Sequence, residues 1–571
     1  MPARLDVQLL GILLVVAVAA MAYWYARGRP ISVAEIPSAS GAGAAKGIRL
    51  ECVSYAPFRI PGESPFNPDT RVTQARLETD LRLLSSVTEC VRIYSVQQGL
   101  DAVPEIARRL GLKIYLGAWI GRNRAENEAE LNLAFDLSRR FPDVVRGLIV
   151  GNEVLLRREL PVEVIAQYLE RARLAVKVPV TYADVWEFWV RNPVLFNKVD
   201  FAMIHILPYW EDDPVPIDQA VPHILNIVRH VREKMPGVAL VIGETGWPSQ
   251  GRARHGAVPS LVNQTRFARE FAIAAPQLGV PYNFIEGFDQ PWKRRLEGAM
   301  GGNWGLFNSA GEQKFAIRGP VPEDVHWLRG WGAGLLGGLA AVLAVLILPD
   351  LVRRQAESAP QKLQLAALAA LGGIGAGAIA MAQWNYMLVW NRTWLEWSVT
   401  GVYTLAALAI WACALLISIN PSAISVNPSA NSVNPPTFGA RNSSTLITSF
   451  AGLRLIILFG AAAMMVLLAF DARYRGFPWP LYSLPSIAFL LVLRQPMQFW
   501  RSGLEERMLA TIVVLCGLAV LFIEGAVNYH AILFVALMMA MASLAVRGDY
   551  RWLSLRTSTS APANAPTAAN S

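Results

Sequence analysis

The sequence predicts an α/β chain: a (β/α)8 TIM barrel followed by an all-α, multi-span membrane domain. Between 47 and 320, short apolar segments alternate with amphipathic helical segments. After about residue 325, apolar runs long enough to cross a bilayer recur. Two of the short apolar segments end in a glutamate, and parallel barrels carry their chemistry at the carboxyl ends of their strands. A doubly wound sheet is the structural alternative, but no glycine-rich phosphate loop follows any strand.

Residues 1–25 are expected to form an N-terminal transmembrane anchor. The segment VQLLGILLVVAVAAMAYWY is close to spanning length, and its final Tyr-Trp-Tyr is typical of an interfacial belt. A cleaved signal peptide is the alternative, because small residues suited to cleavage lie at the end of the run. Residues 26–46 include SASGAGAAKG, which predicts a flexible linker.

Residues 47–320 are expected to form the barrel, whose eight strand candidates lie within about 250 residues, a length typical of this fold. Its strand candidates are 48–56, 89–95, 112–120, 144–153, 176–184, 198–208, 238–246 and 281–289. Cys52 and Cys90 fall at the starts of the first two candidates. A disulfide between them is possible outside the cytoplasm, and the sequence leaves the pairing open.

Residues 326–547 are expected to form a membrane domain of about seven helices. Its apolar runs are 332–350, 364–387, 397–419, 448–470, 478–494, 508–525 and 528–546. The loop 420–447 repeats an Asn-Pro pattern and is expected to be disordered. Residues 548–571 are expected to form a cytoplasmic tail.

The basic residues between these runs predict an orientation. One side would hold Arg353, Arg354, Lys362, Arg441, Arg494, Arg501, Arg507, Arg547, Arg551 and Arg556, and the other only Arg392, Arg473 and Arg475. The positive-inside rule then places both termini in the cytoplasm and the barrel outside, in the periplasm of a cell with an inner membrane. Arg27 and Arg29 outnumber Arg4 at the first span and argue weakly for the reverse.

The net charge of +9 is explained by this bias, with the lipid bilayer as the partner. No basic stripe with interleaved aromatic residues is present, so nucleic-acid binding is not expected. No metal-ligand spacing is present and the six histidines are scattered, so no metal or other cofactor is expected.

Two stretches combine an apolar strand, a glycine and a glutamate. They are LIVGNEV at 148–154, which contains Glu153, and VIGETGWPSQG at 241–251, which contains Glu244. One such glutamate alone is more simply a solvated residue at a strand end. Two of them at the catalytic face of one barrel match what glycosidic bond cleavage requires, which is a pair of carboxylates.

Together with AMIHILPYW and FIEGFDQPWK…EGAMGGNWGLF, these stretches resemble glycoside hydrolase family 17, the β-1,3-glucanase and glucanosyltransferase family. The resemblance covers about 47–310 in the family's motif order. It implies that Glu244 is the nucleophile, which must be ionised, and that Glu153 is the general acid/base, which must begin protonated. It also implies that Asn152 hydrogen-bonds the sugar 2-OH, with a β-1,3-glucan as donor and another sugar as acceptor.

Further residues at the same face are expected to bind substrate. They are Tyr94, Tyr182, Trp186, His205, Tyr209, Trp210, Trp247, Glu286, Asp289, Trp292 and Lys293. Trp119 and Trp304 fall at similar positions. Aromatic rings stack on pyranose rings, but core packing is an equal alternative for the aromatic residues. For the charged cluster around Lys293 the alternative is a structural ion pair, and for His205 a hydrogen-bonded core histidine.

An anchored barrel followed by a multi-span region resembles the membrane-bound rhizobial β-(1,6)-glucan synthases of cyclic β-(1,3),(1,6)-glucan formation. That layout favours a retaining transglycosylase that works beside a separate glucan synthase. A hydrolase would use the same two carboxylates, so the sequence does not separate transfer from hydrolysis. A glucan-binding module coupled to a transporter or assembly protein is a third hypothesis, against which the intact glutamate pair argues.

Overall fold

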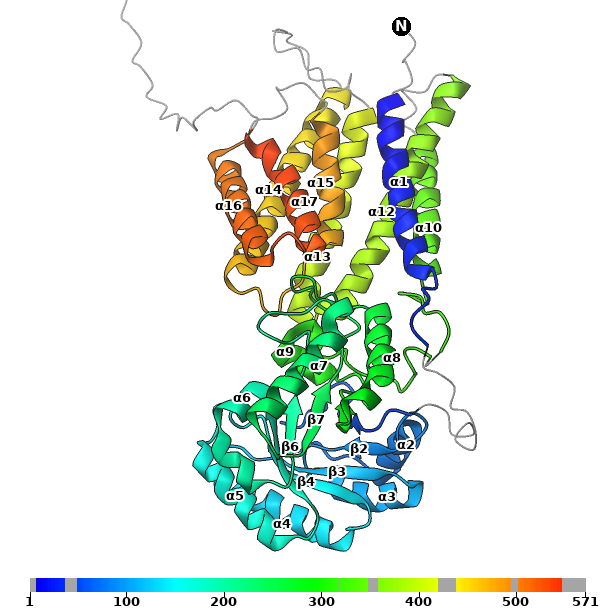
Figure 1. Ribbon diagram of the computed structural model, residues 1–571. Helices are drawn as coiled ribbons and strands as arrows, with labels where there is room; N and C mark the ends of the chain where they lie inside the picture. Colours follow the sequence, from blue (N-terminus) through cyan, green and yellow to red (C-terminus); the bar gives the residue numbers. More distant parts are fainter. Residues whose placement is uncertain are drawn as a thin grey trace, which may run out of the picture.

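The computed structural model describes residues 7–35, 49–316, 318–347, 358–419, 438–493 and 502–546. It has two parts, a barrel and a helical bundle that rests on one side of it (Figure 1).

Eight parallel strands close into a barrel in sequence order, and β1 pairs with both β2 and β8. They are β1 (Val53–Ser54), β2 (Cys90–Arg92), β3 (Lys113–Ala118), β4 (Val145–Asn152), β5 (Val180–Val185), β6 (Ala202–His205), β7 (Leu240–Thr245) and β8 (Tyr282–Phe284). The predicted TIM barrel is confirmed. Each strand is shorter than its apolar segment, because residues such as Ile206 and Ile285 stay buried beyond the end of the paired ladder.

Helices return the chain between the strands and cover the outside of the barrel. They are α2 (Gln74–Leu84), α3 (Val103–Leu110), α4 (Arg124–Arg140), α5 (Val162–Ala175), α6 (Trp186–Arg191), α7 (Ile217–Lys234) and α8 (Leu261–Leu278), with short 3-10 turns η1 (Leu100–Ala102) and η2 (Pro193–Lys198). The 3-10 turn η3 (Pro291–Lys293) and helix α9 (Arg294–Gly301) follow β8. Side-chain caps begin several of them: Asn123 accepts from the amides of Ala125 and Glu126, and Ser260 accepts from that of Asn263.

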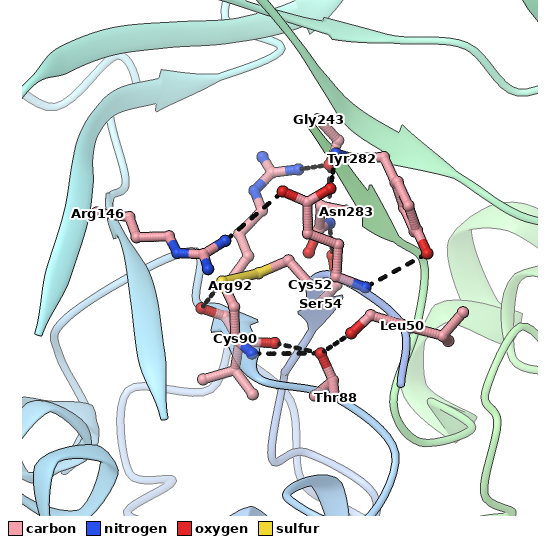
Figure 2. Close-up of a disulfide and its surroundings, with 12 residues drawn as sticks. Leu50, Cys52, Ser54, Thr88, Cys90, Arg92, Arg146, Gly243, Tyr282 and Asn283 are labelled. Atoms are coloured by element: carbon pink, nitrogen blue, oxygen red, sulfur yellow. Dashed lines mark hydrogen bonds and ion pairs between the residues drawn. A yellow bond between two sulfur atoms is a disulfide. The ribbon is translucent and has the colours of Figure 1, made fainter. Parts of the chain in front are cut away.

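Cys52 and Cys90 form a disulfide with a Cα–Cα distance of 4.3 Å, which settles the pairing that the sequence left open. The two cysteines stand at the amino-terminal ends of β1 and β2, the face opposite the one expected to be catalytic (Figure 2). Thr88 Oγ1 donates to the Leu50 carbonyl at 2.8 Å beside it. The two cysteines are 38 positions apart in the sequence. A disulfide that closes a loop of that length lowers the entropy of the unfolded chain and so stabilises the fold by about 4 kcal/mol.

The helical part contains eight apolar helices among the described residues. They are α1 (Val7–Gly28), α10 (Leu328–Ile347), α12 (Ala359–Trp390), α13 (Trp394–Ile419), α14 (Phe438–Phe470), α15 (Trp479–Val492), α16 (Leu504–Glu524) and α17 (Tyr529–Val546). Six are long and apolar enough to cross a membrane, and α15 and the described part of α17 are shorter. The six long helices indicate membrane association.

The expected N-terminal anchor, α1, packs within this bundle beside α10 and α12 (Figure 1). Trp24 Nε1 donates to the Ala378 carbonyl at 3.0 Å. Glycines allow α10 and α12 to approach closely, since a Cβ on Gly337 would lie 2.4 Å from the Gly373 carbonyl oxygen. Small residues at a helix–helix contact are typical of membrane interfaces.

Two expected boundaries need correction. Residues 438–447, expected within a disordered loop, are the first turns of α14; the sequence has no proline after Pro436 to interrupt a helix there. The rest of that loop, 420–437, lies outside the described residues, as do 36–46 of the linker and the tail 548–571. The second correction concerns the boundary between the expected anchor and linker. Residues 26–28, expected in the linker, belong to helix α1, which ends at Gly28, and Ile31 of the linker pairs with Val321.

Candidate active site

A cavity of about 1260 Å³ opens at the carboxyl ends of the strands. Glu153 and Glu244 both line it. Its volume exceeds the 300–1,000 Å³ of typical small-molecule pockets. A site of this size accommodates an oligosaccharide rather than a single sugar.

Glu153 follows β4 in a tight turn. Gly151 has φ 87° and Glu153 itself has φ 53°, a left-handed conformation that is uncommon for a residue other than glycine. The amide of Glu153 donates to the Ala183 carbonyl at 2.8 Å, which joins the turn to β5. This backbone places the carboxylate at the cavity, where its side chain is 24% exposed.

Glu244 lies on β7 and is almost fully buried. Its Oε1 accepts from Arg92 Nη1 at 2.9 Å and from the Tyr94 hydroxyl at 2.8 Å. Burial alone would raise its pKa, but the charges of His205, Arg92 and Lys293, with the Tyr94 hydrogen bond, hold the pKa below the ordinary value. Glu244 is therefore kept ionised, as a carboxylate nucleophile must be.

His205, at the end of β6, stands between the two carboxylates. Its Nδ1 lies 3.1 Å from Glu153 Oε1 and its Nε2 lies 3.8 Å from Glu244 Oε1. Oxygens of the two glutamates approach within 4.8 Å of each other. A separation of about 5–5.5 Å is typical of retaining glycosidases.

These same three side chains could ligate a metal ion. The Arg92 guanidinium lies against two of them, with Nη1 2.9 Å from Glu244 Oε1 and 3.4 Å from His205 Nε2. A fixed positive charge at that point opposes a bound cation. The arrangement therefore fits acid–base and nucleophilic chemistry better than metal chemistry.

Arg92 is a residue of this site that the sequence analysis missed. It is 1% exposed, and besides binding Glu244 it donates to the Gly243 carbonyl at 2.8 Å and to Asn152 Oδ1. Because Oδ1 of Asn152 is engaged, Nδ2 is the atom of this side chain that can donate to a bound group. A charged residue inside the apolar strand ECVRIYS was the available signal.

Six expected substrate-binding residues line the cavity together with the two glutamates. They are Tyr94, Asn152, His205, Trp210, Trp292 and Lys293. Trp119 and Trp304 line it as well, and the guanidinium of Arg157 lies 4.2 Å from the Trp119 ring centroid. The cavity thus has aromatic residues on several of its walls.

Four expected aromatic residues lie behind the wall instead, as the core-packing alternative describes. Tyr182 donates to Asp184 and accepts from the Leu155 amide at 2.9 Å, so it supports the turn after Glu153. The others are Trp186, which contacts the ring of His230, Tyr209, whose hydroxyl donates to the Arg252 carbonyl, and Trp247, which is buried and donates to the Val258 carbonyl. Helix α6 turns Trp186 toward α7, and Phe188, two residues on, lines the cavity.

Glu286 and Asp289 are also buried behind the wall, in ion pairs. Lys293 Nζ lies 3.0 Å from both carboxylate oxygens of Glu286, and Lys314 Nζ lies 2.8 Å from Asp289. Burial raises the pKa of Glu286 to about 7, against the lowering effect of Lys293. Only Lys293 of this expected cluster reaches the cavity, held in place by Glu286.

A family model for the BtgE/BtgC glycoside hydrolase domain matches residues 52–305. The chain is 23% identical over 274 residues to the glucan 1,3-beta-glucosidase of Saccharomyces cerevisiae, a match that covers 44% of this chain and 87% of the yeast protein. It is 25% identical over 285 residues to "Probable glucan endo-1,3-beta-glucosidase btgC" of Aspergillus terreus, covering 43% of this chain and only 42% of that protein.

Among solved structures, the glycoside hydrolase family 17 β-1,3-glucanosyltransferase from Rhizomucor miehei matches 47% of this chain and 97% of that one, with 26% identity and a TM-score of 0.42. The resemblance of the barrel to β-1,3-glucan-directed glycoside hydrolases is confirmed by the family model and the relatives. The likeness of the whole layout to the rhizobial synthases stays a prediction.

Proposed function

We propose that this membrane-associated glycoside hydrolase barrel is a retaining β-glucan transglycosylase that cleaves β-1,3-glucan and transfers the glycosyl group to another sugar. The observation that carries the proposal is the glutamate pair. Glu153 and Glu244 stand at the ends of β4 and β7 with oxygens within 4.8 Å, inside a cavity large enough for an oligosaccharide. The names of the relatives support β-1,3-glucan as the donor.

In the first step Glu244 attacks the anomeric carbon while Glu153 protonates the departing glycosidic oxygen. The glycosidic bond breaks and a glycosyl ester forms on Glu244. In the second step the acceptor hydroxyl gives its proton to Glu153 and its oxygen displaces Glu244. Asn152 donates to the sugar 2-OH, an interaction that strengthens as charge develops at the anomeric carbon.

Transfer competes with hydrolysis of the ester. Water at tens of molar has an advantage of about 10⁴ over a millimolar sugar, which corresponds to roughly 5–6 kcal/mol. A well-oriented acceptor can offset this, since effective molarities reach about 10⁵ M. Trp210, after β6, and Phe188, on helix α6 after β5, line the cavity and are placed to hold it.

Two observations support a periplasmic barrel on an inner-membrane protein. The Cys52–Cys90 disulfide is typical of an oxidising compartment. The barrel also meets the bundle at the loops that carry Arg392 and Arg473, the side with few basic residues. We further propose that the product carries β-1,6 linkages or branches in periplasmic, cyclic glucan, made beside a separate glucan synthase.

Topology can be tested with alkaline phosphatase fusions. A fusion near residue 320 should be active, whereas fusions after 440 or 555 should be inactive. Active fusions at 440 and 555 with an inactive one at 320 would place the barrel in the cytoplasm and contradict the proposal.

The chemistry can be tested with the purified full-length chain and millimolar laminari-oligosaccharides. The wild type should yield lengthened or branched products, and Glu244→Gln should form no glycosyl-enzyme. Azide should partly rescue Glu153→Ala, because a small anion needs no base activation. Glu105→Gln, an exposed glutamate on α3, is the matched control and should behave as wild type.

Undiminished turnover by Glu244→Gln would refute the site assignment. If the wild type gives only shortened sugars, the chain is a hydrolase, the function that the glucosidase names of its relatives favour.

A further inference from the structure

The loop between α14 and α15, residues 471–478, belongs to the helical bundle but reaches the barrel. Arg473 and Tyr474 line the same cavity as Glu153 and Glu244. In Figure 1 this end of the bundle faces the barrel, above α7 and α9. The wall of the cavity is therefore made partly by the bundle.

The two side chains meet Trp210 of the barrel. The Tyr474 and Trp210 rings are 6.3 Å apart between centroids and nearly perpendicular, at 85°. The Arg473 guanidinium carbon lies 5.8 Å from each ring centroid, and that of Arg254 lies 5.6 Å from the Trp210 ring. Tyr474 is 39% exposed. This corner offers two aromatic faces and guanidinium donors, which suit the apolar face and the hydroxyls of a pyranose.

The loop is held in this position by buried charge. Arg252, on the barrel loop after β7, donates to the carbonyls of Ala472 and Arg475 at 2.7 and 2.5 Å. It also forms an ion pair with Glu524 of α16, with side-chain exposures of 3% and 6%. Asn528 donates to Glu524 at 2.7 Å and to a backbone carbonyl of the same barrel loop. Separating such a buried pair is strongly unfavourable, so the barrel and the loop are fixed relative to each other.

Helix α9 of the barrel makes a second set of contacts with the bundle. Gly298 has φ 73°, and a Cβ there would lie 2.9 Å from the Tyr474 carbonyl oxygen. Arg294 donates to the carbonyls of Val389 and Asn391 at the end of α12. On this side the barrel therefore contacts the bundle at the Tyr474 loop and at the end of α12.

We propose that the membrane domain contributes a sugar subsite, in which Tyr474 and Arg473 extend the acceptor platform of Trp210 and bind further units of a β-glucan chain. The proposal rests on the function proposed above. It gives the membrane domain a role beyond anchoring, because an enzyme with this subsite favours chains long enough to reach it.

The test uses the full-length protein in nanodiscs and laminari-oligosaccharides of increasing length. Tyr474→Ala should raise KM about 10-fold for the long chains, as expected for the loss of about 1.4 kcal/mol of stacking. KM for the shortest cleaved chain and kcat should not change. Tyr474→Phe keeps the ring and should restore long-chain KM. Tyr529→Ala removes an exposed tyrosine that does not line the cavity and should have no effect.

Equal KM values for Tyr474→Ala and wild type at every length would overturn the proposal. So would an equal loss on short and long chains, which indicates a structural effect. Affinity measured in a Glu244→Gln background separates this failure from failure of the proposed function, since binding needs no turnover. In that background, weaker binding of long chains only upon Tyr474→Ala supports the subsite, and unchanged binding refutes it.

Discussion

Replacing Arg92 with methionine removes the guanidinium that donates to Glu244 and leaves an uncharged, unbranched side chain in its place. Arg92 donates to Glu244 Oε1 at 2.9 Å, and both side chains are almost fully buried. In the variant, burial continues to raise the pKa of Glu244, while the lowering effect of Arg92 is gone. The folded pKa of Glu244 should therefore rise.

The size of the rise follows from the contact. A hydrogen bond between charged groups is worth about 1.5–3 kcal/mol, and one pKa unit corresponds to 1.36 kcal/mol, so the expected shift is about 1–2 units. Glu244 attacks only when ionised, and its protonated fraction grows as pH falls. The acid limb of the kcat/KM profile should therefore move to higher pH by about 1–2 units, while the alkaline limb stays in place.

The assay is the pH dependence of kcat/KM for laminari-oligosaccharide cleavage by the full-length protein. Arg92→Lys keeps a charge without the forked contact to Asn152, so its acid limb should move less than that of Arg92→Met. The buried pair also stabilises the fold, but the position of a pH limb does not depend on how much enzyme is folded. An acid limb at the wild-type pH in Arg92→Met would refute this account of Glu244.

Three further predictions concern the barrel, its contact with the bundle and the acceptor. The double variant Cys52→Ser/Cys90→Ser should lose about 4 kcal/mol in denaturant unfolding through loop entropy, and an unchanged midpoint would contradict this. Glu524→Gln leaves the Arg252 guanidinium buried without its counter-charge, at a cost of about 3–5 kcal/mol. Faster hydrogen exchange at the 252–257 amides should report the loosened contact, and unaltered protection would argue against it. Phe188→Ala should raise the ratio of hydrolysis to transfer products, and a constant ratio would exclude Phe188 from acceptor binding.

The barrel was predictable because its signal is local. A strand buried on both faces is an apolar run, and each run from IRLECVSYA to PYNFIEGFD coincides with one strand of the closed sheet to within a residue or is longer than it. The ends of the strands were not predictable, since a run continues wherever residues stay buried in a loop. The apolar helices followed from length and hydropathy in the same way, whereas the start of α14 depends on where the last proline falls.

Within the site, the sequence located residues that follow a strand but not the direction of their side chains. Glu153 and Glu244 were found because each interrupts an apolar pattern just where the pattern ends. Trp186 and Phe188 are two residues apart on a helix of one and a half turns, so they point to different sides. Only the packing of α6 against α7 decides which of them reaches the cavity.

The contact between the barrel and the bundle had no sequence signal of its own. Arg473 and Arg475 count in the sequence as two basic residues in a short loop, and Glu524 as an acidic residue at the end of an apolar run. Their roles arise because the chain brings Arg252 to Glu524 across 272 positions. A charged residue at the end of an apolar helix is ordinarily solvated. Glu524 is instead buried against the barrel, where it requires a partner of opposite charge. The same loop that supplies this anchorage carries Tyr474 into the cavity, so the contacts that fix the barrel on the bundle also shape the cavity that Glu153 and Glu244 line.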